Sequence, residues 1–338
     1  MAGPAARAPA RDPAPARLVL LGTGGTIAAT AGHASQLTDY TVTEGIDAML
    51  AAVPGAAALA DIRCEQVFNV DSRQLTTARV LRLARRIDAL LRDPGVDGVV
   101  VTHGTDTLEE TAFFLHLTVR HPKPVVLVGA MRPGSALSAD GPLNLYNALL
   151  VARDPLSRDC GVLVAMNDRI LAARHVAKGH TTRVDAFGAA EPGALGWISD
   201  GAVRIAQRPV LPAAAPFSLA GLRGLPKVDI LYDHQDAGDH LYQAAIEAGV
   251  AGIVVAGLGN GSLSPAALRG CARARRRGIQ CVRASRVPWG EVTAKAADEQ
   301  DGILASRGLN PQQARTLLRL ALARGLDTAA IRAALREL

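Results

Sequence analysis

The sequence predicts an α/β fold of two domains, a large N-terminal domain around a parallel-rich sheet and a smaller C-terminal α/β domain. Short apolar runs alternate with amphipathic stretches over most of the 338 residues, which is the pattern of buried parallel strands joined by helices. At roughly 150 residues per domain, this length suggests about two domains. A stretch rich in proline, alanine and glycine at 207–225 interrupts the alternation, which then resumes.

The same breaks set the expected domain boundaries. Residues 1–16 are rich in alanine, proline and arginine and lack the apolar run of a signal peptide, so we expect a disordered extension on a cytoplasmic protein. Residues 17–206 should form the N-terminal domain, residues 207–225 a linker, and residues 226–338 the C-terminal domain. No apolar run reaches the ~18 residues that a membrane-spanning helix needs.

Each expected element is recognised by its hydrophobic period. The strands, which are short and mostly apolar, cover residues 18–21, 98–102, 125–129, 161–166, 228–232, 252–256, 280–284 and 303–305. The helices, which repeat apolar residues every three or four positions, cover residues 76–92, 108–120, 142–153, 240–247, 265–277, 311–324 and 328–338. Residues 195–205 are typical of a β-hairpin, with Asp200 and Gly201 as its turn.

The positive charge of the chain does not indicate a nucleic-acid binder. Lys and Arg number 37 against 31 Asp and Glu, a net charge of +6, but the charge is scattered and its densest clusters lie on expected helices. Aromatic residues make up only 3% of the chain, too few for a base-stacking surface. We therefore expect solvated helix faces, with neither a nucleic-acid nor a membrane partner.

Cysteine and histidine spacing predicts no metal site. Cys64, Cys160, Cys271 and Cys281 form no CxxC pair, and there is no HExxH motif. We expect reduced, mostly buried thiols, because a chain of this size does not need disulfides. His103 should be a hydrogen-bonded residue at a strand end rather than a base or a ligand. No cofactor is expected.

The segment LVLLGTGGTIAAT at 18–30 places a hydroxyl at the end of a buried strand. A dinucleotide-binding loop would need a glycine where Ile27 stands, and no helical pattern follows, so that interpretation is weak. Thr26 lies where a strand of a parallel sheet delivers side chains to the ligand crevice. Without further context, an ordinary β-branched turn residue is the better interpretation of this threonine.

The segment GVVVTHGTDTLEETAFFL ends a second strand and begins a helix. Thr107 and Glu110 have the spacing of a capping box, so we expect Thr107 to cap the helix. Thr105 and Asp106 lie just before this helix, whose unpaired N–H groups attract anions such as a substrate carboxylate. The two residues could form a catalytic pair, or Asp106 could merely stabilise the turn.

Lys178 is a third candidate because arginine fills most basic positions of this chain. A desolvated lysine can lose its proton, which an arginine effectively cannot. If Lys178 lay beside Thr105 and Asp106, the three would form a triad in which the amine takes the hydroxyl proton and the carboxylate orients the ammonium.

From about residue 18 to the end, the chain resembles the bacterial-type L-asparaginases, the asparaginase/glutaminase family of two-domain amidohydrolases. Two segments are specific together, LLGTGGTIA around Thr26 and VVVTHGTDTLEET around Thr105 and Asp106. Further segments agree in the same order: YTV at 40–42, VFNVDS at 67–72, KPVVLVGAMRP at 123–133, SADGPLNLYNA at 138–148, GVLVAMND at 161–168, KGHTT at 178–182, GLGNGS at 257–262, SRVP at 285–288 and LNPQQAR at 309–315.

The resemblance implies hydrolysis of the side-chain amide of L-asparagine to L-aspartate and ammonia, with no cofactor. Thr26 would be the nucleophile and would form a covalent aspartyl ester that water then cleaves. Tyr40, on the loop after Thr26, would help to activate the Thr26 hydroxyl. Thr105, Asp106 and Lys178 would form the second triad. Which of the two proton shuttles dominates is left open.

Substrate-binding residues are implied in the same way. Ser72 would hold the α-carboxylate of the substrate and Asp106 its α-ammonium, and fixed opposite charges orient a substrate. Backbone N–H groups at Gly25, Thr105 or Ala130 would stabilise the developing oxyanion.

Two further features concern access to the site. Many relatives have glutamine where this chain has Arg73, and a cation there would bind the α-carboxylate more strongly or narrow the pocket against glutamine. The loop at 23–43, rich in small residues, should be a lid that closes over the substrate.

The family pattern implies that each site needs two chains. Asn260 and Ser262 in the turn GLGNGS would reach the site of a neighbouring subunit, which implies a homotetramer built as a dimer of intimate dimers. Glu291 and Glu299 are both open as the acidic residue that relatives lend to the neighbouring site.

Three other functions compete with this interpretation. The enzyme could act on glutamine as well, since one methylene is worth only ~1–3 kcal/mol of discrimination. The chain could be an amino-acid-binding protein without activity. An amidase subunit of a tRNA-dependent amidotransferase would need a tRNA-handling domain, for which the length leaves no room.

Overall fold

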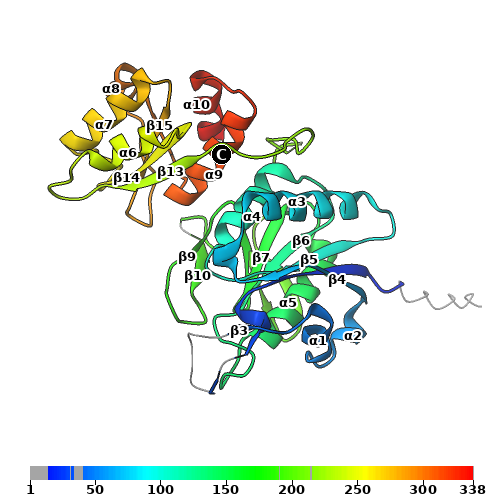
Figure 1. Cartoon of the computed structure of the whole chain (residues 1–338). Helices are drawn as coiled ribbons and strands as arrows, with labels where there is room; N and C mark the ends of the chain where they lie inside the picture. Colours follow the sequence, from blue (N-terminus) through cyan, green and yellow to red (C-terminus); the bar gives the residue numbers. More distant parts are fainter. Residues whose placement is uncertain (1–13, 31, 34–40, 190, 214, 338) are drawn as a thin grey trace, which may run out of the picture.

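The N-terminal part of the computed structural model is an eight-stranded sheet covered on both faces (Figure 1). The structure describes residues 14–30, 32–33, 41–189, 191–213 and 215–337. The strands, in spatial order, are β12 (Ala202–Ile205), β11 (Gly196–Ser199), β8 (Arg169–Ala172), β7 (Val162–Met166), β6 (Val125–Val128), β5 (Gly98–Thr102), β1 (Arg17–Gly24) and β4 (Asp61–Val70). The strands from β7 to β4 pair in parallel, and the three at the other edge pair antiparallel.

Alternation along β1 divides the core between the two faces of the sheet. Val19 and Leu21 pack in the cluster that contains α3 (Thr77–Arg92) and α4 (Leu108–Thr118). Leu18 and Leu20 pack in the cluster on the opposite face, whose helices are α5 (Gly141–Arg153), α1 (Ile46–Ala51) and α2 (Ala56–Leu59). Strands buried on both faces have few polar positions, which is why they appear as nearly continuous apolar runs in the sequence.

The C-terminal domain is a four-stranded parallel sheet (Figure 1). Its strands are β13 (Val228–Tyr232), β14 (Gly252–Gly257), β15 (Gln280–Ser285) and β16 (Ile303–Ala305). One face packs against α6 (His240–Glu247) and α7 (Pro265–Arg276), and α8 (Ala296–Asp301) precedes β16. The other face packs against α9 (Pro311–Ala323) and α10 (Thr328–Glu337).

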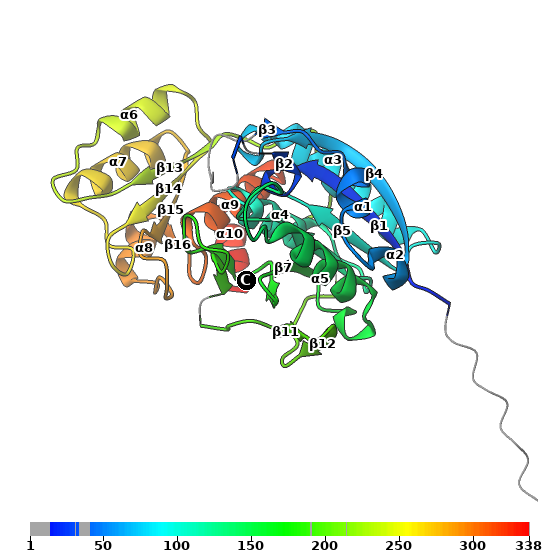
Figure 2. The ribbon, with the colours of Figure 1, turned by 90° about the horizontal axis from the view of Figure 1, so that it is seen from below.

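Helix α9 joins the two domains. Its buried leucines belong to the same hydrophobic cluster as α3 and α4 of the N-terminal domain, and α9 lies directly against α4. In both views α9 is seen between the two sheets (Figure 1, Figure 2). A continuous apolar core therefore connects the domains at this point.

The strands and helices expected from hydrophobic period all have counterparts, and their ends differ by a few residues at most. The hairpin of β11 and β12 is also confirmed. Its turn residues Asp200 and Gly201 have φ values of 50° and 69°, as a two-residue turn matching the strand twist requires. All four cysteines are free and three of them are buried, as expected. No described helix is both long and apolar enough to cross a membrane.

The sequence analysis missed several short elements and one long strand. The ten-residue β4 lies at the sheet edge and pairs only with β1. It carries Asp61, Arg63 and Glu65 and is mostly half-exposed, so it lacks the apolar run of a central strand. Residues 1–13 of the expected extension lie outside the described residues, but the carbonyl of Ala16 accepts a hydrogen bond from the Asp61 amide at 2.9 Å. Ordered pairing therefore begins just before residue 17.

Candidate active site

Three neighbouring parallel strands end at the same edge of the large sheet. After β1 the chain forms a short 3-10 turn, Thr26–Ala28. After β4 it forms a second such turn, Ser72–Gln74, and after β5 it enters α4. Strand β1 lies between β4 and β5. The helices that follow β1 cover one face of the sheet, and those that follow β4 and β5 cover the other. Parallel sheets form ligand crevices at such points.

Glycines bring the three strand ends into backbone contact. Gly25 has a φ of 88°, and a Cβ atom on it would lie 2.3 Å from the backbone of Gly104. A Cβ atom on Gly104 would lie 2.7 Å from the Ser72 side chain. No side chain fits in these gaps, so Thr26, Ser72 and Thr105 flank one close contact. Their side chains are buried.

Lys178 completes the expected triad. It is the last residue of β9 (Val176–Lys178), which pairs with β10 (Phe187–Ala189). Its Nζ atom lies 3.0 Å from Thr105 Oγ1 and 2.7 Å from Asp106 Oδ1. The amine thus sits between a hydroxyl that it could deprotonate and a carboxylate that orients it. An amine held in place by two such contacts is suited to proton transfer.

Glu109 is a residue of this site that the sequence analysis missed. Its Oε2 atom accepts the backbone N–H of Lys178 at 3.0 Å, and its Oε1 atom accepts the Nε2 amide of Gln312 at 3.3 Å. Gln312 lies on α9, so one carboxylate connects the lysine strand to the C-terminal domain. Glu109 and Glu110 both lie in the first turn of α4, and no local sequence pattern distinguishes the buried carboxylate of Glu109 from that of its neighbour.

Burial sets the ionisation of Glu109. The side chain is only 8% exposed, and this burial raises the pKa of the carboxyl to about 7, against the lowering effect of the Lys178 amide. A raised pKa means that folding favours the neutral acid. The stabilisation is complete below the ordinary value of 4.5 and is lost as pH rises through about 7.

We therefore expect Glu109→Gln to flatten the dependence of stability on pH between about 5 and 7. The shift corresponds to roughly 3 kcal/mol between its two limits, at about 1.4 kcal/mol per pKa unit. Urea unfolding at a series of pH values measures this effect. Glu247→Gln, at an exposed helix position, is the matched control. Equal pH dependence in Glu109→Gln and the unaltered protein would contradict the assignment.

The capping box expected at the start of α4 is wrong. Thr107 is the N-cap residue, but its side chain makes no capping bond. Its Oγ1 atom instead donates to the carbonyl of Ser72 at 3.1 Å. This hydrogen bond joins the segment after β5 to the segment after β4, although β1 lies between the two strands. His103, in contrast, is the expected buried strand-end residue, with its ring Nδ1 2.7 Å from the Gly104 carbonyl and its pKa lowered by burial to about 4.

The residues expected to bind substrate surround the same edge. The backbone amide and the guanidinium of Arg73 both donate hydrogen bonds to the Asp71 carboxylate, with Nη2 2.8 Å from Oδ2. This side-chain hydrogen bond holds the pKa of Asp71 below its usual range. Ala130 is buried after β6, next to Gly129, where an added Cβ atom would lie 3.1 Å from Thr105 Cγ2.

Of the loop that should form a lid, the structure describes residues 23–30, 32–33 and 41–43. Tyr40 lies outside the described residues. The ends pair as β2 (Ala29–Thr30) and β3 (Thr41–Val42), and the amide of Thr43 donates to the Ala28 carbonyl at 3.0 Å. Both ends of the loop are thus fastened beside Thr26.

The residues expected to serve a neighbouring subunit lie in the C-terminal domain, after β14. Asn260 exchanges two hydrogen bonds of 2.9 Å with Thr293, and Ser262 Oγ lies 3.4 Å from Lys295 Nζ. Glu291 is paired with Arg307 at 3.1 Å. Within the described ranges, no three His, Cys, Asp or Glu side chains are grouped to hold a metal ion.

Comparisons with known proteins agree with this geometry. The family model "Asparaginase, N-terminal" matches residues 17–211, and the model "Glutaminase/Asparaginase C-terminal domain" matches residues 227–335. The chain is 46% identical over 322 residues to L-asparaginase 2 of Bacillus subtilis (strain 168), covering 94% of this chain and 85% of that protein. It is 42% identical over 318 residues to the glutaminase-asparaginase of Acinetobacter glutaminasificans, covering 92% and 96%.

A solved structure shows the same architecture. The crystal structure of the probable cytoplasmic L-asparaginase from Campylobacter jejuni matches with a TM-score of 0.93 at 44% identity, over 96% of this chain and 100% of that one. Both family models and the relatives span nearly the whole chain, and the specific segments lie at the edge of the sheet where the hydroxyls, Lys178 and Asp106 meet. The chain therefore belongs to the asparaginase family.

Proposed function

We propose that this protein is an amidohydrolase, an L-asparaginase that converts L-asparagine to L-aspartate and ammonia. The observation that carries the proposal is the contact of Lys178 Nζ with both Thr105 Oγ1 and Asp106 Oδ1 at the strand ends that also deliver Thr26. A hydroxyl, an amine and a carboxylate in one chain of contacts are the parts that acyl transfer from an amide requires.

The reaction proceeds in two steps. The Thr26 oxygen attacks the carboxamide carbon, its proton passes to a base, and the C–N bond breaks as ammonia leaves with a proton. Water then attacks the resulting ester, and the C–O bond to Thr26 breaks to release aspartate. Tyr40 activates the Thr26 hydroxyl, and Lys178 with Thr105 and Asp106 moves protons to and from the reacting groups.

The remaining site residues hold the substrate. Ser72 binds its α-carboxylate and Asp106 its α-ammonium. Backbone N–H groups at Gly25, Thr105 and Ala130 stabilise the oxyanion, and loss of such a donor typically costs about 3 kcal/mol. Arg73 could bind the α-carboxylate of the substrate only if its ion pair with Asp71 were broken. We therefore propose that Arg73 affects the shape and charge of the pocket instead.

Ammonia release by the purified protein tests the proposal. L-asparagine, L-glutamine and D-asparagine are compared side by side as kcat/KM, with a coupled assay for ammonia. We expect L-asparagine to be the best substrate. Absence of ammonia release from every amide would leave an amino-acid-binding protein as the explanation of the pocket.

A dual asparaginase and glutaminase is the second candidate. The relative from Acinetobacter glutaminasificans, which is 42% identical, is named a glutaminase-asparaginase. Discrimination by one methylene is worth only ~1–3 kcal/mol. A glutamine kcat/KM within about tenfold of the asparagine value would favour this candidate.

We further propose a homotetramer in which Asn260 and Ser262 reach a neighbouring site. The support is the family pattern and the position of both residues on a glycine turn of the C-terminal domain. Light scattering measures the mass, and dilution measures whether activity follows the assembly. A folded monomer with full asparaginase activity would contradict the proposal.

Two assignments complete the proposal. We place the domain boundaries at 17–206, 207–225 and 226–338. We place the protein in the cytoplasm, with support from the name of the Campylobacter jejuni relative. Fractionation of cells, followed by detection of the protein, tests the location.

A further inference from the structure

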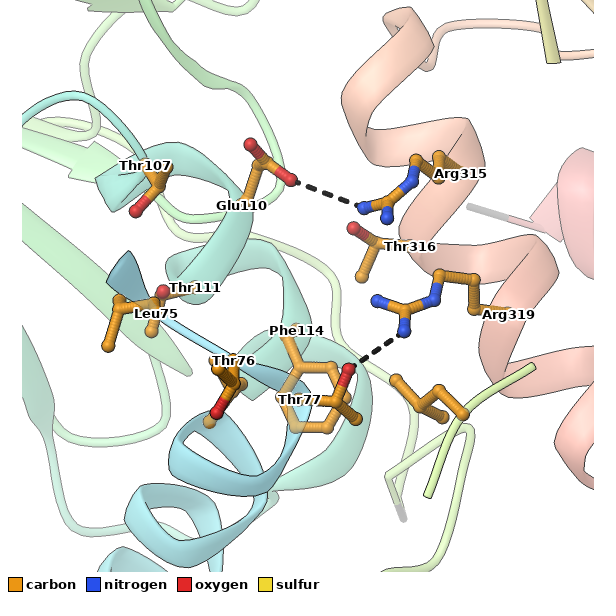
Figure 3. A pocket seen from close by; sticks show the side chains of 12 residues that line it. Leu75, Thr76, Thr77, Thr107, Glu110, Thr111, Phe114, Arg315, Thr316 and Arg319 are labelled. Atoms are coloured by element: carbon orange, nitrogen blue, oxygen red, sulfur yellow. Dashed lines mark hydrogen bonds and ion pairs between the residues drawn. The ribbon is translucent and has the colours of Figure 1, made fainter. Parts of the chain in front are cut away.

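A cavity lies between the two domains, lined in part by Thr76 and Thr107 from the segments beside the candidate active site. Its volume is about 280 Å³, just below the usual range for small-molecule sites. Helix α9 forms one wall, and α4 with the start of α3 forms the other (Figure 3). The cavity is thus bounded by elements of both domains.

Two arginines of α9 are held with their guanidinium groups facing this cavity. Arg315 donates through Nε to the Val228 carbonyl at 2.8 Å, and Arg319 donates through Nε to the Pro226 carbonyl at 3.0 Å. These bonds fix the planes of both groups and leave their outer nitrogens toward α4 and α3 (Figure 3). Arg319 Nη2 donates to Thr77 Oγ1 at 2.8 Å. Pre-oriented guanidinium groups bind carboxylates through paired hydrogen bonds.

The opposite wall carries a single carboxylate. Glu110 Oε2 lies 3.7 Å from Arg315 Nη1, too far for a hydrogen bond. Burial raises the pKa of Glu110 and lowers that of Arg319 to about 10, and a guanidinium group with this pKa stays charged at neutral pH. The cavity therefore presents two guanidinium groups and one carboxyl group, and the ion pair between Arg315 and Glu110 is wide, at 3.7 Å.

The walls of the cavity continue into the candidate active site. Thr76 and Thr77 follow Ser72 along the chain, and Thr107 lines the cavity while donating to the Ser72 carbonyl at 3.1 Å. Glu110 lies one helical turn after Asp106. A ligand in the cavity would thus contact segments that also hold catalytic groups.

We propose that this cavity binds a small acidic α-amino acid. Such a molecule has two carboxylates and one ammonium group, which match two guanidinium groups and one carboxylate in number and sign. Thr76, Thr77 and Thr316 add hydroxyls for hydrogen bonds. L-aspartate has this charge pattern, and its choice as the ligand rests on the proposed function, because it is the product of that reaction.

Calorimetric titration of L-aspartate into the full chain tests the proposal. Aspartate also enters the active site as product, so we expect two binding components. Arg319→Met or Arg315→Met should weaken one component about tenfold or more, the size expected on losing a charge-assisted hydrogen bond. Arg324→Met is the matched control, since Arg324 also donates to a backbone carbonyl, that of Ala220 at 3.0 Å, but does not line the cavity. Ammonia release from asparagine by the same samples reports the proposed function separately.

Glu110→Gln keeps the volume of the side chain and is the second test variant if an arginine variant fails to fold. This substitution should weaken the binding of aspartate but not that of succinate, which lacks the ammonium group. An unchanged aspartate isotherm in Glu110→Gln and in the arginine variants would overturn the proposal. The proposal would also be overturned if inorganic phosphate bound the cavity as tightly as aspartate, because that result would identify a general anion site.

Discussion

Thr26→Ala is expected to abolish ammonia release from asparagine while the protein stays folded. The alanine lacks the oxygen that forms the ester, so no covalent step remains. Removal of a catalytic nucleophile commonly costs on the order of 10⁴-fold or more in rate. The side chain lies in a short turn whose close backbone contact is made by the neighbouring Gly25, so we expect the turn to accept an alanine. Steady-state kinetics and circular dichroism measure the two effects.

Thr26→Ser is the matched control for this change. It keeps a hydroxyl at the same position and should retain a measurable fraction of the rate. Full activity in Thr26→Ala would end the assignment of the nucleophile. A slow acyl donor that labels a different residue, as read by mass spectrometry of peptides, would do the same.

Lys178→Met is expected to slow the chemical step by about 10²- to 10⁴-fold, the usual contribution of a positioned acid or base. Methionine keeps the length of the side chain but removes the amine that joins Thr105 to Asp106. Single-turnover kinetics separates this loss from substrate binding. KM should change less than kcat if the amine acts mainly in proton transfer.

Two further variants sharpen the test of Lys178. Lys178→Arg keeps the positive charge but effectively cannot release a proton, so it should be nearly as slow as Lys178→Met. Lys227→Met, just before β13, should leave the rate unchanged. A normal single-turnover rate in Lys178→Met would place the base elsewhere.

The sequence was informative wherever a short segment decides its own conformation. The apolar runs of β5 and β6 and the amphipathic period of α3 predicted these elements to within a residue. Thr26, Thr105 and Asp106 stood out because they follow buried strands, and parallel strands share the edge at which they end. Edge strand β4 escaped notice because charged residues interrupt its apolar pattern.

Contacts between segments far apart in the sequence could not be predicted from local patterns. Lys178 and Thr105 are 73 positions apart, and the sequence could state only what they would do if they met. The bond from Thr107 to Ser72 replaced the local capping bond that the spacing favoured, because a partner from another strand was available. The contact of Glu109 with Gln312 spans 203 positions, and no local pattern distinguishes a buried carboxylate from an exposed one at a helix start.

By itself the sequence determined the α/β class, the central strands and the long helices in their order, and two of the segments that end at the reactive edge of the sheet. Only the tertiary structure decided which of these side chains touch, how Glu109 is buried, and that two arginines face Glu110 across a cavity between the domains. The physical reason is that hydrophobic period and turn residues act over a few neighbours in the chain. Burial, ion pairing and the pKa values that follow from them depend on packing between segments far apart in sequence.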